Sequence, residues 1–266
     1  MLLSDILKIA EGFEKSFLEV IFSLRHEILE KLKNTDVVGY NPFGEKSRAF
    51  DEEISKLLIE RFVKHGFKGA IVTEEKTVKN ISDEVIFIDP VDGSLNAARG
   101  INIFAFEACY AKKPGIDFLS ASIIWNIPFN QYFIALSTRG AYKCSQEGCA
   151  NIEARRKDFE DTVIEVGNTS GDAFLKIKKI GTTRILGSIA YAFTKLVEGD
   201  IDAIFDNSGK LKFTDVAACI LLLREAKAHC YWQLSGDLRS NPRVKIIAST
   251  DRNLFEELLS IFEETK

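Results

Sequence analysis

The 266-residue sequence is poor in the residues that mark several protein classes. It has 3 His, at positions 26, 65 and 229, so a histidine-rich metal site is not expected. Its 5 Cys form no Cys-x-x-Cys pair and lie mostly in apolar runs, which predicts reduced, buried thiols. Cys144 and Cys149 are accordingly expected to be unpaired.

Long hydrophobic runs and an excess of positive charge are also absent. The longest uninterrupted apolar run covers residues 216–223, whereas a bilayer span needs about 20 residues. Asp5, Lys8 and Glu11 interrupt the stretch that a signal peptide would need. The formal net charge of -4 argues against a dedicated nucleic-acid binder. We therefore expect a cytoplasmic protein with no membrane or nucleic-acid partner.

The composition, 46% hydrophobic and 28% charged, is that of a globular chain able to bury a substantial core. Apolar spacing predicts one long helix over 6–34 and another over 51–65. Strands are predicted at 69–75 and 84–90, followed by an antiparallel sheet over 103–144 with a hairpin turn at Arg139-Gly140. Beyond residue 160 strands and helices alternate, which is typical of an α/β arrangement. The predicted units are residues 1–150 and 151–266.

The most informative segment follows the strand at 84–90. Asp89 and Asp92 lie three residues apart with Pro90 between them, and a helical turn there would direct both carboxylates to one side. Gly93 and Ser94 then open a helix whose free backbone N–H groups could bind a phosphate. The segment therefore offers ligands for a hard cation beside donors for an anion.

Two further acids strengthen this prediction: Glu74 at the end of the preceding strand and Asp215 at the start of an apolar helix. If all four carboxylates meet, each close pair repels by roughly 4 kcal/mol at an effective dielectric of 20. The sequence offers no matching Lys or Arg at these positions, so divalent ions are expected to neutralise them. Ligands that are all oxygen select Mg²⁺, Mn²⁺ or Ca²⁺.

Simpler roles stand beside these. Asp89, Asp92 and Asp215 could each cap a turn or helix, and Ser188 fits a helix cap better than a nucleophile. Three basic residues are candidates for a second phosphate, although they could equally be solvated surface charges: Arg184, Lys210 and Lys212. Two residues separate the aspartates, which disfavours an aspartyl-phosphate mechanism, and no Walker loop is present.

These motifs, together with Arg184-Ile185-Leu186-Gly187-Ser188 and Asp215-Val216-Ala217-Ala218, resemble the inositol monophosphatase family, particularly its archaeal branch that also hydrolyses fructose 1,6-bisphosphate. The resemblance runs from about residue 5 to 260. It implies a mixed α+β and α/β fold, layered as an α-β-α-β-α sandwich. Thr214 and Cys219 depart from the family pattern, which commonly has Trp and Gly there.

The resemblance also implies roles for individual residues. Glu74, Asp89 and the carbonyl of Val91 would bind a first Mg²⁺, while Asp89, Asp92 and Asp215 would bind a second. Gly93 and Ser94 would donate N–H groups to phosphate, and Glu74 with Ser94 would orient the attacking water. Asp51 would help to activate water or bind a third, weaker ion.

The implied activity is hydrolysis of a phosphomonoester, inositol 1-phosphate or fructose 1,6-bisphosphate or both, without a covalent intermediate. Mn²⁺ is expected to substitute for Mg²⁺, lithium to inhibit, and the chain to form a homodimer. Two alternatives stay open: a nucleotide-type substrate such as NADP or 3'-phosphoadenosine 5'-phosphate, and a binding or regulatory protein without turnover. The pattern does not identify the sugar or cyclitol phosphate.

Overall fold

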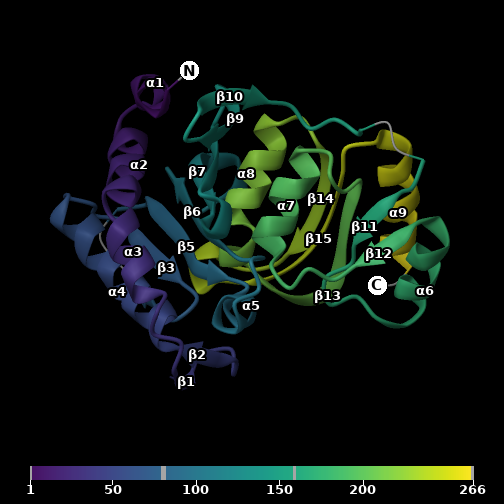
Figure 1. The fold of residues 1–266 in the computed structure, drawn as a ribbon, viewed down its shortest axis with the longest axis horizontal. Helices are drawn as coiled ribbons and strands as arrows, with labels where there is room; N and C mark the ends of the chain where they lie inside the picture. The colour runs from purple at the N-terminus through teal and green to yellow at the C-terminus, as the bar shows by residue number, and fades with distance from the viewer. Residues whose placement is uncertain (1, 79–81, 158–159, 265–266) are drawn as a thin grey trace.

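The computed structural model describes residues 2–78, 82–157 and 160–264. Its elements form five layers that alternate between helices and sheets from left to right in Figure 1. The sandwich predicted for this chain is therefore confirmed. Within the described residues no helix is long and apolar enough to cross a membrane.

The first layer consists of helices from the N-terminal part of the chain: α1 (Leu3–Ile9), α2 (Phe13–Ser23), α3 (Arg25–Lys31) and α4 (Ala49–Lys64). The single helix predicted over 6–34 is wrong, because the backbone is extended at Ala10 and has a φ of +53° at Gly12. A second interruption falls at Leu24. The apolar spacing continues across the breaks because all three helices bury side chains in the same core.

The second layer is an eight-stranded sheet in the order β10-β9-β8-β7-β6-β5-β3-β4. Its strands are β3 (Ala70–Thr73), β4 (Thr77–Val78), β5 (Val85–Asp92), β6 (Ala105–Ala111), β7 (Leu119–Asn126), β8 (Gln131–Leu136), β9 (Gly140–Ser145) and β10 (Gly148–Ile152). β3 and β5 are parallel, and the other described pairs are antiparallel. The antiparallel sheet and the turn at Arg139-Gly140 are thus confirmed.

The connections of this half contain a short hairpin and three small helices. They are β1 (Val37–Tyr40) with β2 (Lys46–Arg48), α5 (Ser94–Arg99), η1 (Ile116–Phe118) and η2 (Ile127–Phe129). α5 begins directly after β5, so the chain turns from strand to helix at Gly93.

The third layer is formed by α7 (Ile189–Val197) and α8 (Ala217–Glu225), which lie between the two sheets (Figure 1). The second sheet has the order β12-β11-β13-β15-β14. Its strands are β11 (Val163–Glu165), β12 (Thr182–Arg184), β13 (Ala203–Lys212), β14 (His229–Leu234) and β15 (Arg243–Ser249), while η3 (Phe213–Asp215) and η4 (Leu238–Ser240) are connections. The fifth layer is α6 (Gly171–Ile180) with α9 (Arg252–Glu264).

The predicted alternation beyond residue 160 is confirmed, with two differences. The apolar residues at 202–205 predict a strand, and β13 extends well past them, whereas the polar sequence of β12 does not predict a strand. The two sheets divide the described chain between Ile152 and Val163. One core cluster nevertheless contains residues from both sheets and from α7 and α8, so the boundary at residue 150 stays a prediction.

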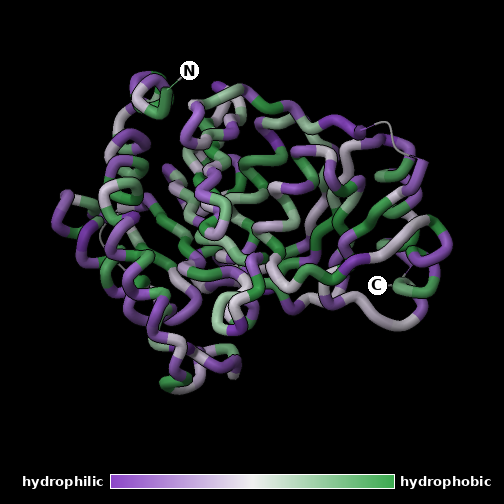
Figure 2. The backbone as a smooth tube through the Cα atoms, in the orientation of Figure 1, coloured by the Kyte–Doolittle hydropathy of each residue, from purple (hydrophilic) through white to green (hydrophobic). Residues whose placement is uncertain are grey.

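Hydrophobic residues follow the strands and the inner faces of the helices through all layers (Figure 2). One cluster fills the space between the N-terminal helices and the first sheet. A second surrounds α7 and α8, and a third lies between the second sheet and the outer helices. These cores hold the ends of β3, β5 and β13 in fixed relation to η3.

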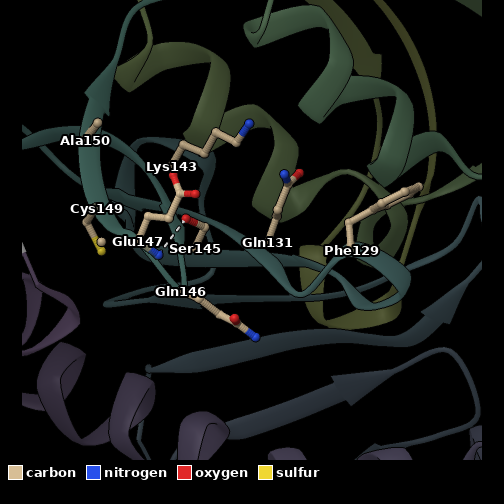
Figure 3. Close-up of a pocket in the computed structure, with 9 residues that line it drawn as sticks. Phe129, Gln131, Lys143, Ser145, Gln146, Glu147, Cys149 and Ala150 are labelled. Carbon is tan, nitrogen blue, oxygen red and sulfur yellow. Dashed lines mark hydrogen bonds between the residues drawn. The ribbon is translucent and has the colours of Figure 1, made fainter.

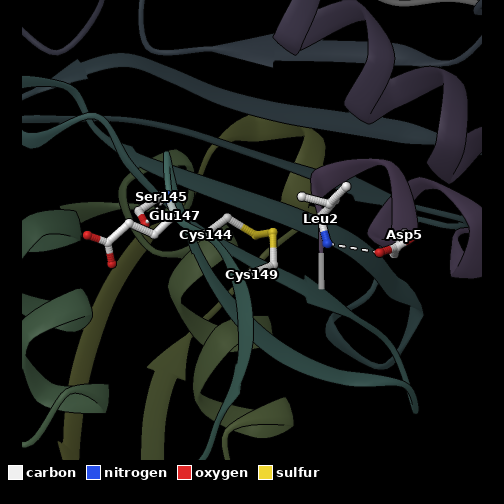
Figure 4. Close-up of a disulfide and its surroundings, with 6 residues drawn as sticks. All are labelled: Leu2, Asp5, Cys144, Ser145, Glu147 and Cys149. Atoms are coloured by element: carbon white, nitrogen blue, oxygen red, sulfur yellow. Dashed lines mark hydrogen bonds between the residues drawn. A yellow bond between two sulfur atoms is a disulfide. The ribbon is translucent and has the colours of Figure 1, made fainter.

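The expectation for two cysteines is wrong, because Cys144 and Cys149 form a disulfide (Figure 4). They are direct partners in the β9–β10 hairpin, with Cα atoms 4.0 Å apart. Spacing in the sequence could not show that a tight hairpin turn places the two thiols opposite each other. Cys109, Cys219 and Cys230 are free thiols, and the first two are buried.

Candidate metal and phosphate site

Several cavities in the described part of the chain, of about 450–670 Å³, are large enough to bind a small molecule, and two of them bear on the choice of site. One, of about 670 Å³, lies against the β9–β10 hairpin and is lined by side chains such as Phe129, Gln131 and Lys143 (Figure 3). It contains none of the predicted site residues. The other, of about 520 Å³, contains nearly all of them, and it is therefore the candidate site.

The candidate cavity brings together chain segments that are far apart in sequence. Eight predicted residues line it: Asp51, Glu74, Asp89, Val91, Asp92, Gly93, Ser94 and Asp215. Lys212 also lines it, whereas Arg184 and Lys210 do not. Arg184 is exposed and donates a hydrogen bond to the carbonyl of Thr183, so its predicted phosphate contact has no support from its position.

Asp89 and Asp92 both lie in β5 and not in a helical turn, which corrects the expected local structure. The register against β6 shifts between them, and this irregularity lets both line the same cavity. The Val91 N–H donates to Asp89 Oδ1 over 3.0 Å. Asp92 Oδ2 accepts hydrogen bonds from the Ser188 hydroxyl and, over 2.7 Å, from the Ala190 N–H.

The prediction that Ser188 caps a helix is confirmed. Ser188 is the N-cap of α7, and its side chain accepts a hydrogen bond from the Tyr191 N–H. Its hydroxyl also binds Asp92, which links β5 to α7 across the cavity. The start of α7 therefore fixes the orientation of one predicted metal ligand.

Gly93 joins β5 to α5 with a φ of +86°, a conformation that favours glycine. A Cβ atom at this position would lie 2.9 Å from Ser188 Cβ and 3.1 Å from the carbonyl oxygens of Gly187 and Ile103. Only a residue without a side chain fits there. The turn places Gly93 and Ser94 in the cavity wall, where the sequence predicts the phosphate donors.

Ser94 and Asp51 form a second polar pair. The Ser94 hydroxyl lies 3.1 Å and 3.2 Å from the two carboxylate oxygens of Asp51 and 2.8 Å from the carbonyl of Val91. Burial raises the pKa of Asp51 to about 7. In this structure the Ser94 hydroxyl thus lies against Asp51, and its role with Glu74 in orienting a water molecule stays a prediction.

Lys212 corrects the expectation that the acids have no basic neighbour. Its ammonium is ion-paired with Glu74 and lies 2.6 Å from Glu45 Oε2, and its side chain is only 5% exposed. Its backbone N–H also donates to Asp215 Oδ2 over 2.9 Å. No pattern in the sequence predicts this ion pair, since Lys212 and Glu74 are 138 positions apart.

Burial and mutual repulsion raise the proton affinity of these acids. Burial raises the pKa of Glu74 to about 8 and that of Asp92 to about 7. The pKa of Asp89 lies well above its usual value because of burial and the neighbouring charges of Glu74, Asp92 and Asp215. The ionised carboxylates of the site therefore repel one another, and a bound cation would stabilise them.

The donor set matches the cation preference predicted from the sequence. All the predicted side-chain ligands are carboxylates, and the cavity is buried, acidic and short of positive charge, which fits Mg²⁺ or Mn²⁺. Within the described ranges, no three His, Cys, Asp or Glu side chains are positioned to bind one ion together. The fit is therefore one of donor chemistry and charge, and not of ligand geometry.

Several other polar residues lie at or near the site, and the sequence prediction did not single them out. Asn41 donates to Glu74 over 3.1 Å, and Glu165 and Asp206 line the cavity from the second sheet. Glu107 lies in β6 and is completely buried. Only Glu107 had a usable signal, because it is a lone carboxyl within an apolar strand.

The layered architecture and the buried carboxylate cavity define an α/β protein built around an oxygen-ligand site. The model of the inositol monophosphatase family matches residues 2–266. A fructose-1,6-bisphosphatase/inositol-1-monophosphatase of Thermococcus kodakarensis is 30% identical over 265 residues, covering 94% of this chain and 99% of that relative. The chain belongs to the inositol monophosphatase family, as its motifs predicted.

Solved structures show the same fold. An inositol monophosphatase-fructose 1,6 bisphosphatase superposes with a TM-score of 0.78 at 23% identity. The match covers 94% of this chain and 100% of that one. An IMPase/NADP phosphatase complexed with Mg²⁺ and phosphate has a TM-score of 0.76 at 16% identity, covering 94% of each chain. At these identities the likeness concerns the fold alone.

Proposed function

We propose that this chain is a Mg²⁺-dependent phosphomonoester hydrolase that releases phosphate from inositol 1-phosphate, fructose 1,6-bisphosphate or both. The observation that carries the proposal is the convergence of Glu74, Asp89, Asp92 and Asp215 on one buried cavity beside Gly93 and Ser94. Family membership and the phosphatase names of its relatives support it. The solved relative complexed with Mg²⁺ and phosphate supports the choice of metal.

Glu74, Asp89, Asp92, Asp215 and the carbonyl of Val91 would bind two Mg²⁺ ions, with Asp51 available to a third. Bound Mg²⁺ would supply the positive charge that activates water and stabilises the leaving oxygen. Gly93 and Ser94 would bind the phosphate through backbone N–H groups. Asp51, with its pKa raised to about 7, can hold or release a proton near neutral pH beside the Ser94 hydroxyl.

The cavity composition bears on the substrate. Lys212 and Lys46 line the cavity, but Arg184 and Lys210 do not, and Glu165 and Asp206 occupy the wall formed by the second sheet. Carboxylates accept hydrogen bonds from hydroxyl groups and repel a second phosphate. This favours the monophosphate of a polyol over a bisphosphate. NADP is a second candidate, because one solved relative is named an NADP phosphatase.

The test is steady phosphate release with Mg²⁺ from inositol 1-phosphate, fructose 1,6-bisphosphate and NADP. We expect turnover with at least one substrate, loss of turnover in a chelator, and recovery with Mg²⁺ or Mn²⁺. Tight Mg²⁺ and substrate binding without phosphate release would instead indicate a binding or regulatory protein. We also propose that the chain is cytoplasmic and forms a homodimer.

A further inference from the structure

Asn96 is a partly buried residue that the proposed mechanism does not use. It belongs to α5, the helix that follows Gly93, and it does not line the candidate cavity. Its Nδ2 atom donates hydrogen bonds to the carbonyl oxygens of Ile103 and Leu186, each over 2.8 Å. An amide nitrogen carries two hydrogens, so these bonds use both of its donors. Because Leu186 is 90 positions further along the chain, this one amide connects α5 to the segment that leads into α7.

The segment that accepts this hydrogen bond lies between β12 and α7 and forms part of the cavity wall. Gly187 and Ser188 line the cavity, whereas Leu186 does not. The Leu186 N–H donates to Glu165, at 3.1 Å and 3.2 Å from its two carboxyl oxygens. Both polar backbone groups of Leu186 are therefore bound by side chains, one from β11 and one from α5. These side chains hold a segment that is neither strand nor helix.

The same segment orients a predicted metal ligand. The Ser188 hydroxyl and the Ala190 N–H both donate to Asp92 Oδ2. Ser188 is two residues after Leu186, so a shift of the Leu186 backbone would move these donors relative to Asp92. The hydrogen bond from Asn96 therefore acts close to a metal ligand that Asn96 itself does not bind.

Two glycines mark how closely this segment approaches α5. A Cβ atom at Gly187, where φ is +77°, would lie 3.0 Å from Asn96 Nδ2. A Cβ atom at Gly93 would lie 3.1 Å from the carbonyl oxygens of both Gly187 and Ile103. Ile103 is also the second acceptor of the Asn96 amide. The amide thus holds the backbone on both sides of Gly93, where the starts of α5 and α7 meet.

We infer that Asn96 is a positioning residue of the phosphate and metal site: its amide holds the start of α7 against the start of α5 and so fixes Ser188 and Asp92 relative to Gly93. Because the effect on catalysis rests on the proposed function, Asn96 should change turnover without contacting substrate or metal. An error of about 1 Å in the placement of reacting groups can lower a rate on the order of 100-fold.

Two substitutions separate the donors of this side chain from its shape. Asn96→Asp is nearly isosteric but places an oxygen against two carbonyl oxygens, whereas Asn96→Ala only removes the donors. We expect kcat/KM for phosphate release at saturating Mg²⁺ to fall about 10-fold in Asn96→Ala and about 100-fold in Asn96→Asp. If Asn96→Asp does not fold, the alanine variant alone is compared with the wild type.

Asn126→Ala is the matched control. The Asn126 amide also connects the first sheet to α7, because its Nδ2 atom donates to Thr194 Oγ1 over 2.8 Å. Asn126 is completely buried and does not line the cavity. We expect Asn126→Ala to lower the urea midpoint of unfolding at least as much as Asn96→Ala, and to keep kcat/KM within about 3-fold. Equal losses of kcat/KM in the two variants would reflect lost stability and would overturn the inference.

A double-mutant cycle tests the same contact without a measurement of activity. Gly187→Ala places a Cβ atom against Asn96 Nδ2, and Asn96→Ala removes that nitrogen. In urea unfolding with a chelator, Gly187→Ala should therefore lower the midpoint less in the Asn96→Ala background than in the wild type. Equal shifts in the two backgrounds would show that Asn96 does not hold this segment, which also overturns the inference.

The inference and the proposed function have different contrary results. Wild-type kcat/KM in both Asn96 variants would overturn the inference and leave the proposed function intact. Absence of phosphate release from the wild-type chain would instead refute the proposed function, and the unfolding cycle would still test the contact between Asn96 and Gly187.

Discussion

Lys212 and Glu74 form a buried ion pair that joins the end of β13 to the segment after β3. The two elements belong to different sheets, so the pair connects the two halves of the site. Glu74 is also a predicted metal ligand, and a bound cation and the Lys212 ammonium would therefore interact with the same carboxylate.

Replacing Lys212 with Met should destabilise the protein by about 3 kcal/mol in a chelator, because a buried acid loses its partner. The loss should be smaller with Mg²⁺, since the divalent ion can compensate Glu74 instead. Urea unfolding with and without Mg²⁺ measures both effects. Lys210→Met serves as a control on the same strand, since Lys210 is exposed and outside the cavity lining. Equal losses with and without Mg²⁺ would contradict this prediction.

Asp89→Asn and Asp92→Asn should each reduce Mg²⁺-dependent phosphate release by more than about 100-fold, which exceeds the usual effect of an outer-shell change. The fold should remain, because an amide oxygen can still accept the bonds from Val91, Ser188 or Ala190. Phosphate release and circular dichroism test the two parts. Full activity in either variant would remove the basis of the ligand assignment.

Gly93→Ala should lower stability by about 1–3 kcal/mol and impair phosphate binding, because the new Cβ would collide with Ser188. Gly100→Ala is a close control: Gly100 also has a positive φ, +71°, but a Cβ there would meet no atom within 4 Å. It should show the backbone strain without the collision. Thermal unfolding and inorganic phosphate titration compare them, and equal effects in both variants would argue against a specific role for the turn.

The acids of the cavity predict a pH dependence of stability in the absence of divalent cations. Burial raises the pKa of Asp51 from 3.8 to about 7, so the folded state binds a proton that the unfolded state has released. Stability should therefore fall as pH rises from about 4 to 7. Asp51→Asn should reduce this fall by up to about 2 kcal/mol between pH 5 and 7. Urea unfolding at the two pH values checks the difference, and parallel curves would be the contrary result.

Glu14 predicts the opposite dependence. Its burial alone would raise its pKa, but hydrogen bonds from Arg139 and Ser120 outweigh burial and hold the pKa below 4.5. The carboxylate therefore stabilises the fold above about pH 4.5, and this contribution is lost as pH falls through the lowered value.

Arg139→Met should consequently cost about 3 kcal/mol at pH 7 and much less at a pH below the lowered pKa of Glu14, where its carboxyl is protonated. Arg139 lies 2.6 Å from both carboxylate oxygens of Glu14. Arg155→Met, which removes an exposed ion pair with Glu153, should change stability little at either pH, because water screens this pair. Urea unfolding of both variants at the two pH values measures this, and a loss that is equal at both would be inconsistent with the ion pair.

Local patterns of apolar residues were enough to predict several helices and strands. Short, mainly apolar runs predicted β6, β7 and β8, which are buried on both faces, and helical spacing predicted α4 and α9, each of which buries one face. The motif around Asp89 and Asp92, with Glu74 and Asp215, identified the family and eight of the residues that line one cavity. Most of these residues carry a carboxylate, and this shared chemistry could be recognised although the residues lie far apart in the sequence.

Tertiary structure decided what depends on distance through space. It placed Lys212 beside Glu74, Ser188 beside Asp92 and Cys144 opposite Cys149, and it left Arg184 and Lys210 outside the cavity. It also placed Glu107 opposite Asp89 on the neighbouring strand, a pairing that the sequence pattern alone could not reveal. A sequence pattern reports which face of an element is buried, but only the packing of the layers sets which charges and thiols share that buried space.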